Sequence, residues 1–345
     1  MNKPENITIN TIAEKAGTSK MTVSRVLNNH PYVKSKTRSK ILNLIKKLKF
    51  HPNITAVNLS RKTPQTIALV IQYEHLFTNY YFTEVLQGIE KIVDDYSYNL
   101  IILNVTSRQE EEVERVTNWY FGKFVKGFLV MVPAQDSILV KKMREADIPF
   151  VLIGASGGFR GSNFVDVENY TGAYKAAKYL ISLGHSQIGF IAGPPERGDA
   201  HEREAGFRKA LADKGVPVSE NLVVCGHFKE DLGYQAMLQL LIQPTRPTAV
   251  FAANDLMAKG AMMAIKESGL QIPKDISIIG FDDIDVASQL IPSLTTVKQP
   301  MFRLGTEAAG FLIEYTPEVD KPLHLILPTE LIIRESSSRI WHFQK

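Results

Sequence analysis

The 345-residue sequence contains a single cysteine, so no disulfide within the chain can stabilise the fold. This residue, Cys225, ends the apolar run at residues 222–225, which predicts a buried small side chain rather than a nucleophile. Runs of 18 apolar residues are also absent, and residues 1–4 lack the apolar segment of a secretory signal. We therefore expect a soluble, cytoplasmic protein with no membrane contact.

The sequence also lacks the glycine-rich loops that bind nucleotide phosphates. Residues 191–198 contain two glycines and two prolines, but they match neither G-x-x-x-x-G-K-[S/T] nor G-x-G-x-x-G. An enzyme such as a sugar kinase or phosphatase would need such a loop or a catalytic pair. We therefore predict no catalytic residues, no cofactor and no metal site.

Acidic residues are scarce in only one part of the chain. Residues 1–62 hold 13 Lys or Arg and 2 acidic residues, a net charge of +11, whereas the remaining chain holds 27 against 34, a net charge of −7. These values give the overall charge of +4. A charge run alone is usually a solvated face, but a segregated positive end is what a phosphate-binding module needs.

Residues 8–28 have the pattern of two short helices joined by a tight turn. Thr8 can cap the first helix, Gly17 suits a left-handed position after its end, and Ser19 can cap the second helix. Four small or apolar residues would pack the two helices together: Ile12, Ala16, Val23 and Val26. An ordinary helical hairpin can share these features, but the positive charge favours a helix-turn-helix for the major groove of DNA.

A third amphipathic helix is predicted to follow. Ser35 is a plausible cap, and apolar residues recur at the spacing i, i+3, i+4, i+7 at Ile41, Leu44, Ile45 and Leu48. This helix would close a small three-helix core. Residues 50–64 then form a connector with a helical centre, which Pro52 and Asn53 can start.

From residue 65 onward, short apolar runs alternate with helical periods. The runs expected to be strands are residues 66–71, 99–104, 127–132, 150–153, 187–192, 248–252 and 276–280. This alternation predicts parallel sheets covered by helices, with ligand-binding loops at the carboxyl ends of the strands. The length of the chain predicts two or three domains.

Several short motifs, taken in order, resemble the lac repressor family of bacterial transcription regulators. After the helix-turn-helix, the landmarks are LGH at 183–185, IAGPP at 191–195, REAGF at 203–207, FAAND at 251–255, IIGFDD at 278–283 and LTTVKQP at 294–300. Each motif is weak alone, but the set spans roughly residues 7 to 337. The resemblance implies an α/β fold with an N-terminal three-helix helix-turn-helix domain, a hinge helix, and a two-lobed periplasmic-binding-protein-like core with parallel sheets.

The resemblance also implies domain boundaries. The expected parts are a DNA-binding domain at 1–52, a hinge and linker at 53–64, an N-terminal lobe at 65–162 and 291–323, a C-terminal lobe at 163–290 and 324–338, and a tail at 339–345. The chain would then cross between the lobes near 161–163, 290–292 and 322–324, with a crossover strand at 294–299.

On the DNA side, Lys20 and Met21 match family positions that vary with operator sequence, and Arg25 matches a position serving common bases or phosphates. Leu59 matches a leucine that wedges into the minor groove and kinks the duplex, although Val57 replaces a common arginine nearby. The full set of expected DNA contacts is Ile9, Lys20, Met21, Thr22, Ser24, Arg25, Asn28, Tyr32, Asn53, Ala56 and Leu59.

For the effector, the matching positions are Tyr81, Phe82, Arg203, Phe228, Asn254 and Asp282. Aromatic faces cover the C–H groups of a polyol, while Arg, Asn and Asp pair with its hydroxyls. Judged without the resemblance, Arg203 is more often a surface ion pair, Phe228 a core residue and Asp282 a loop or capping residue. Relatives often place an acidic residue and an arginine where this chain has Gly154 and Ala155, so one expected hydroxyl acceptor is missing.

Together these features predict a homodimeric DNA-binding transcription regulator, a repressor, that binds a pseudo-palindromic operator. Its effector would be a small molecule, with a sugar or sugar derivative favoured. Two alternatives stay open: a global regulator controlled by a protein partner, and a sugar-binding transport protein. The transport alternative needs a signal peptide and has no use for residues 7–62.

Overall fold

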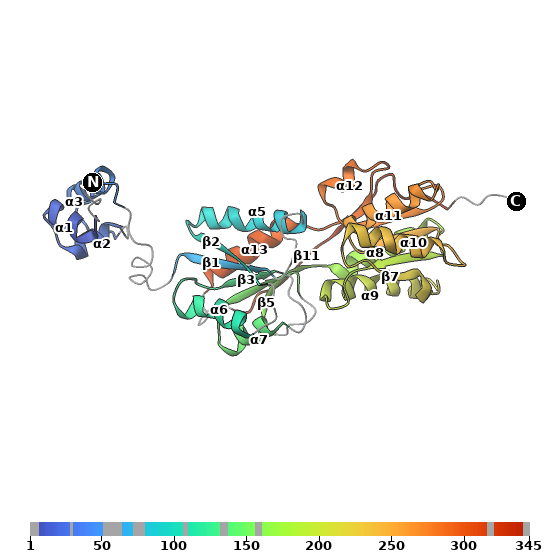
Figure 1. Cartoon of the computed structure of the whole chain (residues 1–345), viewed down its shortest axis with the longest axis horizontal. Helices are drawn as coiled ribbons and strands as arrows, with labels where there is room; N and C mark the ends of the chain where they lie inside the picture. The colour runs from blue at the N-terminus through green and yellow to red at the C-terminus, as the bar shows by residue number, and fades with distance from the viewer. Residues whose placement is uncertain are drawn as a thin grey trace, which may run out of the picture. The chain divides into compact units, whose positions relative to one another are not determined.

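The computed structural model of the chain describes residues 7–27, 30–50, 64–71, 80–105, 110–131, 137–155, 161–315 and 321–340 (Figure 1). The chain divides into two compact units, Met1–Pro64 and Gln65–Lys345. Each unit has its own hydrophobic core. Among the described residues, no helix combines the length and apolar character needed to cross a bilayer.

The first unit contains the predicted three helices, α1 (Ile9–Ala16), α2 (Lys20–Leu27) and α3 (Ser35–Lys47). Thr8 caps α1 by accepting a hydrogen bond from the backbone of Thr11, and Gly17 takes the left-handed conformation after the helix, with φ of 65°. Ser19 accepts a hydrogen bond from the Thr22 backbone at 3.2 Å. These three predicted caps are therefore confirmed.

The predicted packing of this unit is also confirmed. The core consists of Ile12, Ala13, Ala16, Val23, Val26, Ile41 and Phe50, with Leu44, Ile45 and Leu48 packed against it. The predicted cap of α3 is wrong, because Ser35 is already the first helical residue and Lys34 is the N-cap residue, without a side-chain bond.

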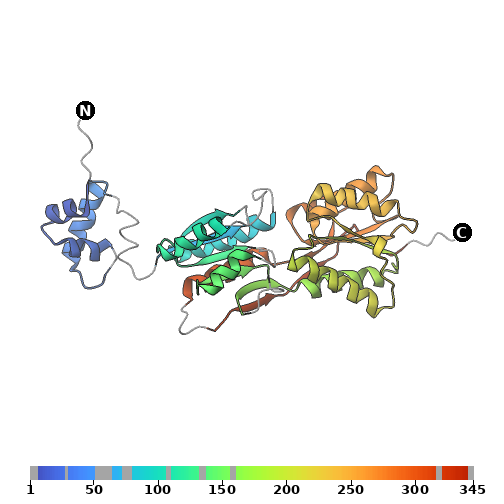
Figure 2. The same cartoon turned by 60° about the horizontal axis from the view of Figure 1, so that its bottom comes forward.

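The second unit contains two six-stranded sheets, each covered by helices (Figures 1 and 2). The first sheet has the order β11-β5-β4-β3-β1-β2, and its paired strands are all parallel. Its strands are β1 (Thr66–Ile71), β2 (Asn99–Asn104), β3 (Phe128–Met131), β4 (Phe150–Ile153), β5 (Asn163–Val167) and β11 (His324–Leu327). Its helices are α5 (Tyr80–Asp95), α6 (Glu110–Phe121), α7 (Ile138–Glu145) and α13 (Met301–Glu314).

Alternate residues of the first sheet face different helices. Ile67, Leu69 and Ile71 of β1 lie in one cluster with α5 and α13, whereas Ala68 and Val70 lie in another with α6 and α7. Both faces of the inner strands β1, β3 and β4 are therefore buried, which explains why these three strands read as continuous apolar runs.

The second sheet has the order β12-β10-β9-β8-β6-β7 and is parallel except for the antiparallel pair β10–β12. Its strands are β6 (Ile188–Ala192), β7 (Val223–Cys225), β8 (Ala249–Ala252), β9 (Ser277–Asp282), β10 (Thr295–Lys298) and β12 (Glu330–Ile332). The associated helices are α8 (Asn169–Ser182), α9 (Gly198–Asp213), α10 (Glu230–Leu241), α11 (Asp255–Glu267) and α12 (Asp285–Gln289), with a short 3₁₀ turn η2 (Glu220–Leu222). Figure 2 shows α8 with α9, and α10 with α11, on opposite faces of this sheet.

All seven runs expected to be strands contain one, and β10 lies within the expected crossover segment. The predicted crossing points are wrong, however. β5 pairs with β4 and β11 in the first sheet, so the first crossing follows residue 167 rather than residues 161–163. The second follows β10, which pairs with β9, and the third lies between β11 and β12.

The lobes defined by the sheets therefore differ from the expected domain boundaries. The first lobe comprises the described residues within 65–167 and 301–327, and the second comprises residues 169–298 and 330–340. The expected tail also begins too early, because the Ile340 backbone donates a hydrogen bond to the Leu183 carbonyl at 3.1 Å.

The prediction for Cys225 is also wrong, because this side chain is exposed. Cys225 lies on β7, the edge strand of the second sheet, where the strand is only partly covered. The residue is exposed as a whole, but its thiol is partly covered and donates to the Gly193 carbonyl at 3.2 Å, and this partial burial raises the pKa of the thiol. A raised pKa lowers the thiolate fraction at neutral pH, so this cysteine has no sign of activation.

Candidate DNA-binding and effector sites

Helix α2 presents a polar and basic face on the first unit. Val23 and Val26 are buried in the core, whereas Lys20 and Arg25 are exposed and Met21 is 64% exposed. A methionine side chain this exposed leaves apolar surface in contact with water. The same surface suits contact with base edges and thymine methyl groups in the major groove.

The other predicted DNA-binding residues fall into three groups. Thr22 and Ser24 are half-buried, and the Thr22 hydroxyl lies 3.0 Å from the Ser19 hydroxyl at the start of α2. Tyr32 is 87% exposed, whereas Ile9 packs against the core of the unit. Asn28, Asn53, Ala56 and Leu59 lie outside the described residues.

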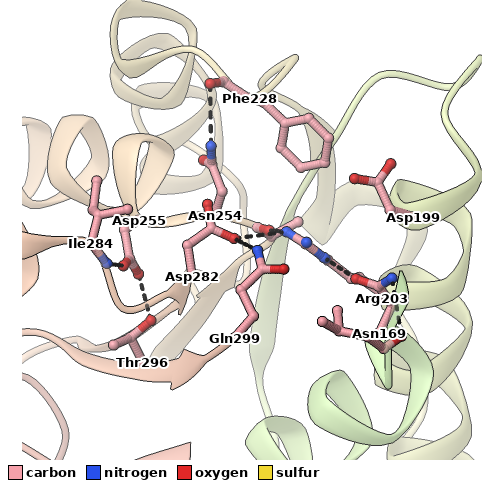
Figure 3. A network of polar contacts seen from close by, with 12 residues as sticks. Asn169, Asp199, Arg203, Phe228, Asn254, Asp255, Asp282, Ile284, Thr296 and Gln299 are labelled. Atoms are coloured by element: carbon pink, nitrogen blue, oxygen red, sulfur yellow. Dashed lines mark hydrogen bonds and ion pairs between the residues drawn. The ribbon is translucent and has the colours of Figure 1, made fainter. Parts of the chain in front are cut away.

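In the second unit, Arg203 is the centre of a buried polar network (Figure 3). Its guanidinium donates from Nε to Asn169 Oδ1 at 2.9 Å, and from Nη1 to the Ala253 carbonyl at 2.6 Å and to Asp282 Oδ1 at 3.3 Å. The guanidinium carbon also lies 3.8 Å from the centre of the Phe281 ring. Arg203 is 4% exposed, so the interpretation as a surface ion pair is wrong.

Local sequence explains how Arg203 reaches this position. Gly206, one turn later in α9, lies against α8, and a Cβ there would stand 2.2 Å from the Tyr170 carbonyl oxygen. The glycine of the REAGF motif therefore permits close helix packing. Asn169, the first residue of α8, is thereby brought within hydrogen-bond distance of Arg203.

Asp282 completes the network at the carboxyl end of β9. It accepts a hydrogen bond from Gln299 Nε2 at 2.6 Å in addition to the bond from Arg203. Asp282 and Asp283 have φ angles of 120° and 58°, conformations that cost a non-glycine residue of order 1–3 kcal/mol each. Such strain is concentrated at functional sites, which supports a role for this loop beyond packing.

Phe228 and a second ion pair lie beside Arg203. The guanidinium carbons of Arg197 and Arg203 are 5.3 and 5.6 Å from the centre of the Phe228 ring. Arg197 binds Asp199 through two hydrogen bonds of 2.9 and 2.6 Å. Burial opposes ionisation of Asp199, but Arg197 outweighs it and holds the pKa of this carboxyl below its usual value. Phe228, like His227, has a positive φ.

Asn254 and Phe82, both expected to bind the effector, have structural roles in the protein. Asn254 caps α11 by accepting from the Met257 backbone at 2.9 Å, and its amide donates to the Phe228 carbonyl at 3.2 Å. It therefore positions Phe228 as well as ending the loop after β8. Phe82 is 4% exposed and belongs to the core of the first lobe.

Tyr81 extends the polar cluster to the first lobe. Burial of its hydroxyl raises its pKa, and the nearby charges of Asp166 and Asp199 raise it further, while Arg197 and Arg203 oppose them. The charged groups that affect this hydroxyl come from both lobes, Asp166 from the first and Asp199, Arg197 and Arg203 from the second. Of the six residues expected to bind the effector, Arg203, Phe228, Asn254 and Asp282 lie in this cluster, with Tyr81 near its charged groups, whereas Phe82 lies in the core of the first lobe.

Sequence reasoning missed five polar residues of this cluster: Asp166, Asn169, Arg197, Asp199 and Gln299. Asp166 is the last but one residue of β5, Gln299 follows β10, and the other three lie at the start of α8 or α9, so all five are near the carboxyl end of a strand or the start of a helix. A polar residue at such a place in the sequence is the signal that could have identified them, because ligand-binding residues gather at the carboxyl ends of parallel strands.

The LGH motif has a structural role instead. His185 is 3% exposed and bonds to Thr248 Oγ1 at 2.9 Å and to the Ser338 carbonyl at 3.0 Å. It thereby attaches the C-terminal segment to the second lobe, and burial lowers its pKa.

The environment of Asp282 predicts a pH-dependent stability difference. Burial raises the pKa of this carboxyl to about 6, against the opposing effects of Arg203 and Gln299. Because the unfolded value is about 4, the folded state binds the proton more tightly, so this stabilisation is complete below pH 4 and is lost as the pH rises through 6. Relative to Asp282→Asn, the wild type should lose on the order of 2–3 kcal/mol of unfolding free energy between pH 4 and 7.

Urea denaturation of both proteins at a series of pH values measures this difference. Subtracting one series from the other removes the contributions of groups that titrate alike in both. A difference that is constant from pH 4 to 7 would contradict the raised pKa.

A helix-turn-helix with an exposed basic helix, followed by a two-lobed core with a buried polar site, defines a DNA-binding regulator with an effector domain. Two family models match the chain: bacterial regulatory proteins of the lacI family at residues 8–53, and the periplasmic binding protein-like domain at residues 177–337. Catabolite control protein A of Priestia megaterium is 32% identical over 334 residues, 96% of this chain and 99% of that protein.

Two solved structures are similar over the whole chain. The transcriptional regulator CelR–cellobiose complex has a TM-score of 0.74 and 33% identity, covering 96% of this chain and 100% of that one. The lac repressor dimer bound to operator and the anti-inducer ONPF has a TM-score of 0.86 and 29% identity, covering 96% and 99%. The chain belongs to the lacI family of bacterial regulatory proteins, and it is a DNA-binding transcription regulator controlled by a small-molecule effector.

Proposed function

We propose that this protein is a homodimeric, cytoplasmic repressor, without enzymatic activity, whose affinity for operator DNA changes when a neutral carbohydrate binds between its two lobes. The observation that carries the proposal is the polar cluster around Arg203, where two ion pairs and an aromatic ring meet at the carboxyl ends of strands. The similar lac repressor structure is a dimer bound to operator, and the similar CelR structure is a complex with cellobiose.

The charges of the cluster favour a neutral effector. Arg203 is paired with Asp282 and Arg197 with Asp199, and Asp166 adds a further carboxyl group near Tyr81. An anionic ligand would therefore have to separate an ion pair or approach a carboxylate, which is costly in a buried site. Hydroxyl groups can instead donate to the carboxylates and accept from the guanidinium groups, while Phe228 covers C–H groups.

Calorimetry tests this assignment directly. The apo protein would be titrated with neutral sugars, including cellobiose and ribose, and with the phosphates of the same monosaccharides. We expect binding of at least one neutral sugar and at least about tenfold weaker binding of its phosphate, a difference of about 1.4 kcal/mol. Preference for the phosphates would contradict the neutral assignment, and no binding across the panel would favour control by a protein partner.

On the DNA side, we propose that Lys20 and Met21 read base edges, while Ser24 and Arg25 serve bases or phosphates common to related operators. Two copies bind together because one short helix in one groove gives little affinity, and the symmetry of the dimer calls for a pseudo-palindromic operator. Residues 53–60, including Leu59, are proposed to contact the minor groove between the half-sites.

Replacing Lys20 and Met21 should change operator preference more than non-specific affinity. Both side chains are exposed at the start of α2, where a helix-turn-helix contacts bases. Selection of operators from a random DNA library should return different half-sites for the double variant Lys20→Ser/Met21→Gln, with about 1–3 kcal/mol of discrimination at each altered position. Asn43→Ser serves as the control, because it changes an exposed side chain on α3 that is not among the expected DNA contacts. Recovery of the wild-type operator by the double variant would mean that the recognition helix is misplaced.

A further inference from the structure

Asp255 is a fully buried acidic residue that the proposed effector site does not use. It is the first residue of α11, next to Asn254, and its side chain is 0% exposed. Burial raises the pKa of this carboxyl well above its usual value, and the nearby charge of Asp282 raises it further. Burying an acidic group in this way is costly unless the group is hydrogen-bonded.

The carboxyl group of Asp255 joins three elements of the second lobe (Figure 3). Oδ1 accepts a hydrogen bond from the Thr296 hydroxyl of β10 at 2.5 Å, and Oδ2 accepts from the backbone of Ile284 at 2.9 Å. A Cβ at Gly280 would stand 2.1 Å from Asp255 Oδ1. The glycine of the GFDD motif therefore leaves room for this carboxyl group over β9.

Residues next to the hydrogen bonds of Asp255 contact the first lobe. Ile284 is 5% exposed and belongs to the hydrophobic cluster of the first lobe, together with Phe82 and Met301. Leu256, which follows Asp255, and Val286 pack against the same cluster. The described residues of the loop after β9 and the start of α11 therefore reach across to the first-lobe core.

The same loop begins in the polar network. Asp282 bonds to Arg203 and Gln299, and it lies only two residues before Ile284. The loop thus has an effector-site residue at one end and a lobe-contact residue at the other. The hydrogen bond from the Ile284 backbone to Asp255 fixes the orientation between them.

We propose that Asp255 is a positioning residue that couples the effector site to the contact between the lobes, by holding the 282–286 loop against Thr296 and α11. A change at Asp282 is then transmitted to Ile284 and the first-lobe cluster, because the loop moves as one rigid piece. The inference rests on the proposed effector site, but its test needs no effector.

Hydrogen exchange of the full-length protein, followed by mass spectrometry, tests the first part of the inference. Asp255→Ala should speed exchange by about tenfold or more in residues 283–290 and in residues 80–86 of the first lobe, because both lose a fixed neighbour. Asp255→Asn keeps an acceptor for the Ile284 backbone and can donate to Thr296, so it should exchange like the wild type. Asp275→Ala is the matched control, since Asp275 accepts a backbone hydrogen bond from Gln271 at 2.7 Å at the opposite end of β9.

A double-mutant cycle tests the coupling. Asp282→Asn alone should change exchange in residues 80–86 by about threefold or more, but it should cause no further change in the Asp255→Ala background. Equal effects of Asp282→Asn in both backgrounds would overturn the proposal. So would faster exchange that stays within the second lobe, or an Asp255→Asn variant that behaves like Asp255→Ala. Calorimetry with sugars is independent of these readouts, so a failure of the proposed effector class would be seen separately.

Discussion

Operator binding should weaken by about three to five orders of magnitude between 50 and 200 mM salt, as expected for a protein that contacts six to ten phosphates. The reason is the segregated charge of residues 1–62, with 13 Lys or Arg against 2 acidic residues. Exposed lysines continue this charge along α3, at Lys36, Lys40, Lys46 and Lys47. Fluorescence anisotropy with a selected operator, repeated at several salt concentrations, gives the slope of log affinity against log salt, expected to be about −6 to −10 for a dimer.

Charge variants locate the phosphate contacts. Lys36 and Lys40 are one helical turn apart on α3, and replacing both by Gln should make the slope shallower by about two to four for a dimer. Lys274→Gln, an exposed lysine of the second unit, is the control and should leave the slope unchanged. An operator affinity independent of salt would reject the assignment of residues 1–62 to DNA.

The local features of the first unit could be predicted because short-range physics determines them. Thr8, Gly17 and Ser19 act within one or two turns of their own helices, and the apolar spacing of α1, α2 and α3 directly specifies the core. The wrong cap at Ser35 concerns a single residue, which is the usual uncertainty of a helix end.

The crossing points between the lobes could not be predicted in the same way. β5, with its polar Asn163 and Asp166, and the partly exposed edge strands β11 and β12 lack the continuous apolar runs of the inner strands. Their sheet membership depends on pairing with residues far away in sequence, as between β11 and β5. Neither local periodicity nor the short motifs that carry the family resemblance specify such pairs, and all three crossings lie several residues later than the resemblance implies.

The effector site was only partly predictable for a related reason. Arg203 and Asp282 lie on recognisable motifs, but their partners Asn169 and Gln299 are common polar residues whose roles appear only when the strand ends meet. The same holds for Arg197, which approaches Phe228 from the loop before α9. The resemblance implies both Tyr81 and Phe82 as effector residues, but successive residues of a helix face different directions, and Phe82 faces the core.

Arg203→Ala should both destabilise the second lobe and abolish the effector response. The substitution removes the hydrogen bonds to Asn169, Ala253 and Asp282, and it leaves a buried carboxyl group without its cation. Breaking a buried ion pair in this way typically costs 3–5 kcal/mol, which urea denaturation at pH 7 would measure. If the proposed site is correct, affinity for the effector should fall by at least about a hundredfold, equivalent to about 2.7 kcal/mol.

A second variant separates the loss of stability from the loss of binding. In Arg203→Ala/Asp282→Asn the remaining side chain is uncharged, so at least about half of the lost unfolding free energy should return at pH 7. The effector response should stay absent, because neither the guanidinium nor the carboxylate is restored, while the first unit still binds operator. Phe228→Ala completes the set, since it removes the ring beside both Arg197 and Arg203 without removing a charge. Should Arg203→Ala, Asp282→Asn and Phe228→Ala all respond to the true effector as the wild type does, the proposed site is wrong, and control by a protein partner becomes the better explanation.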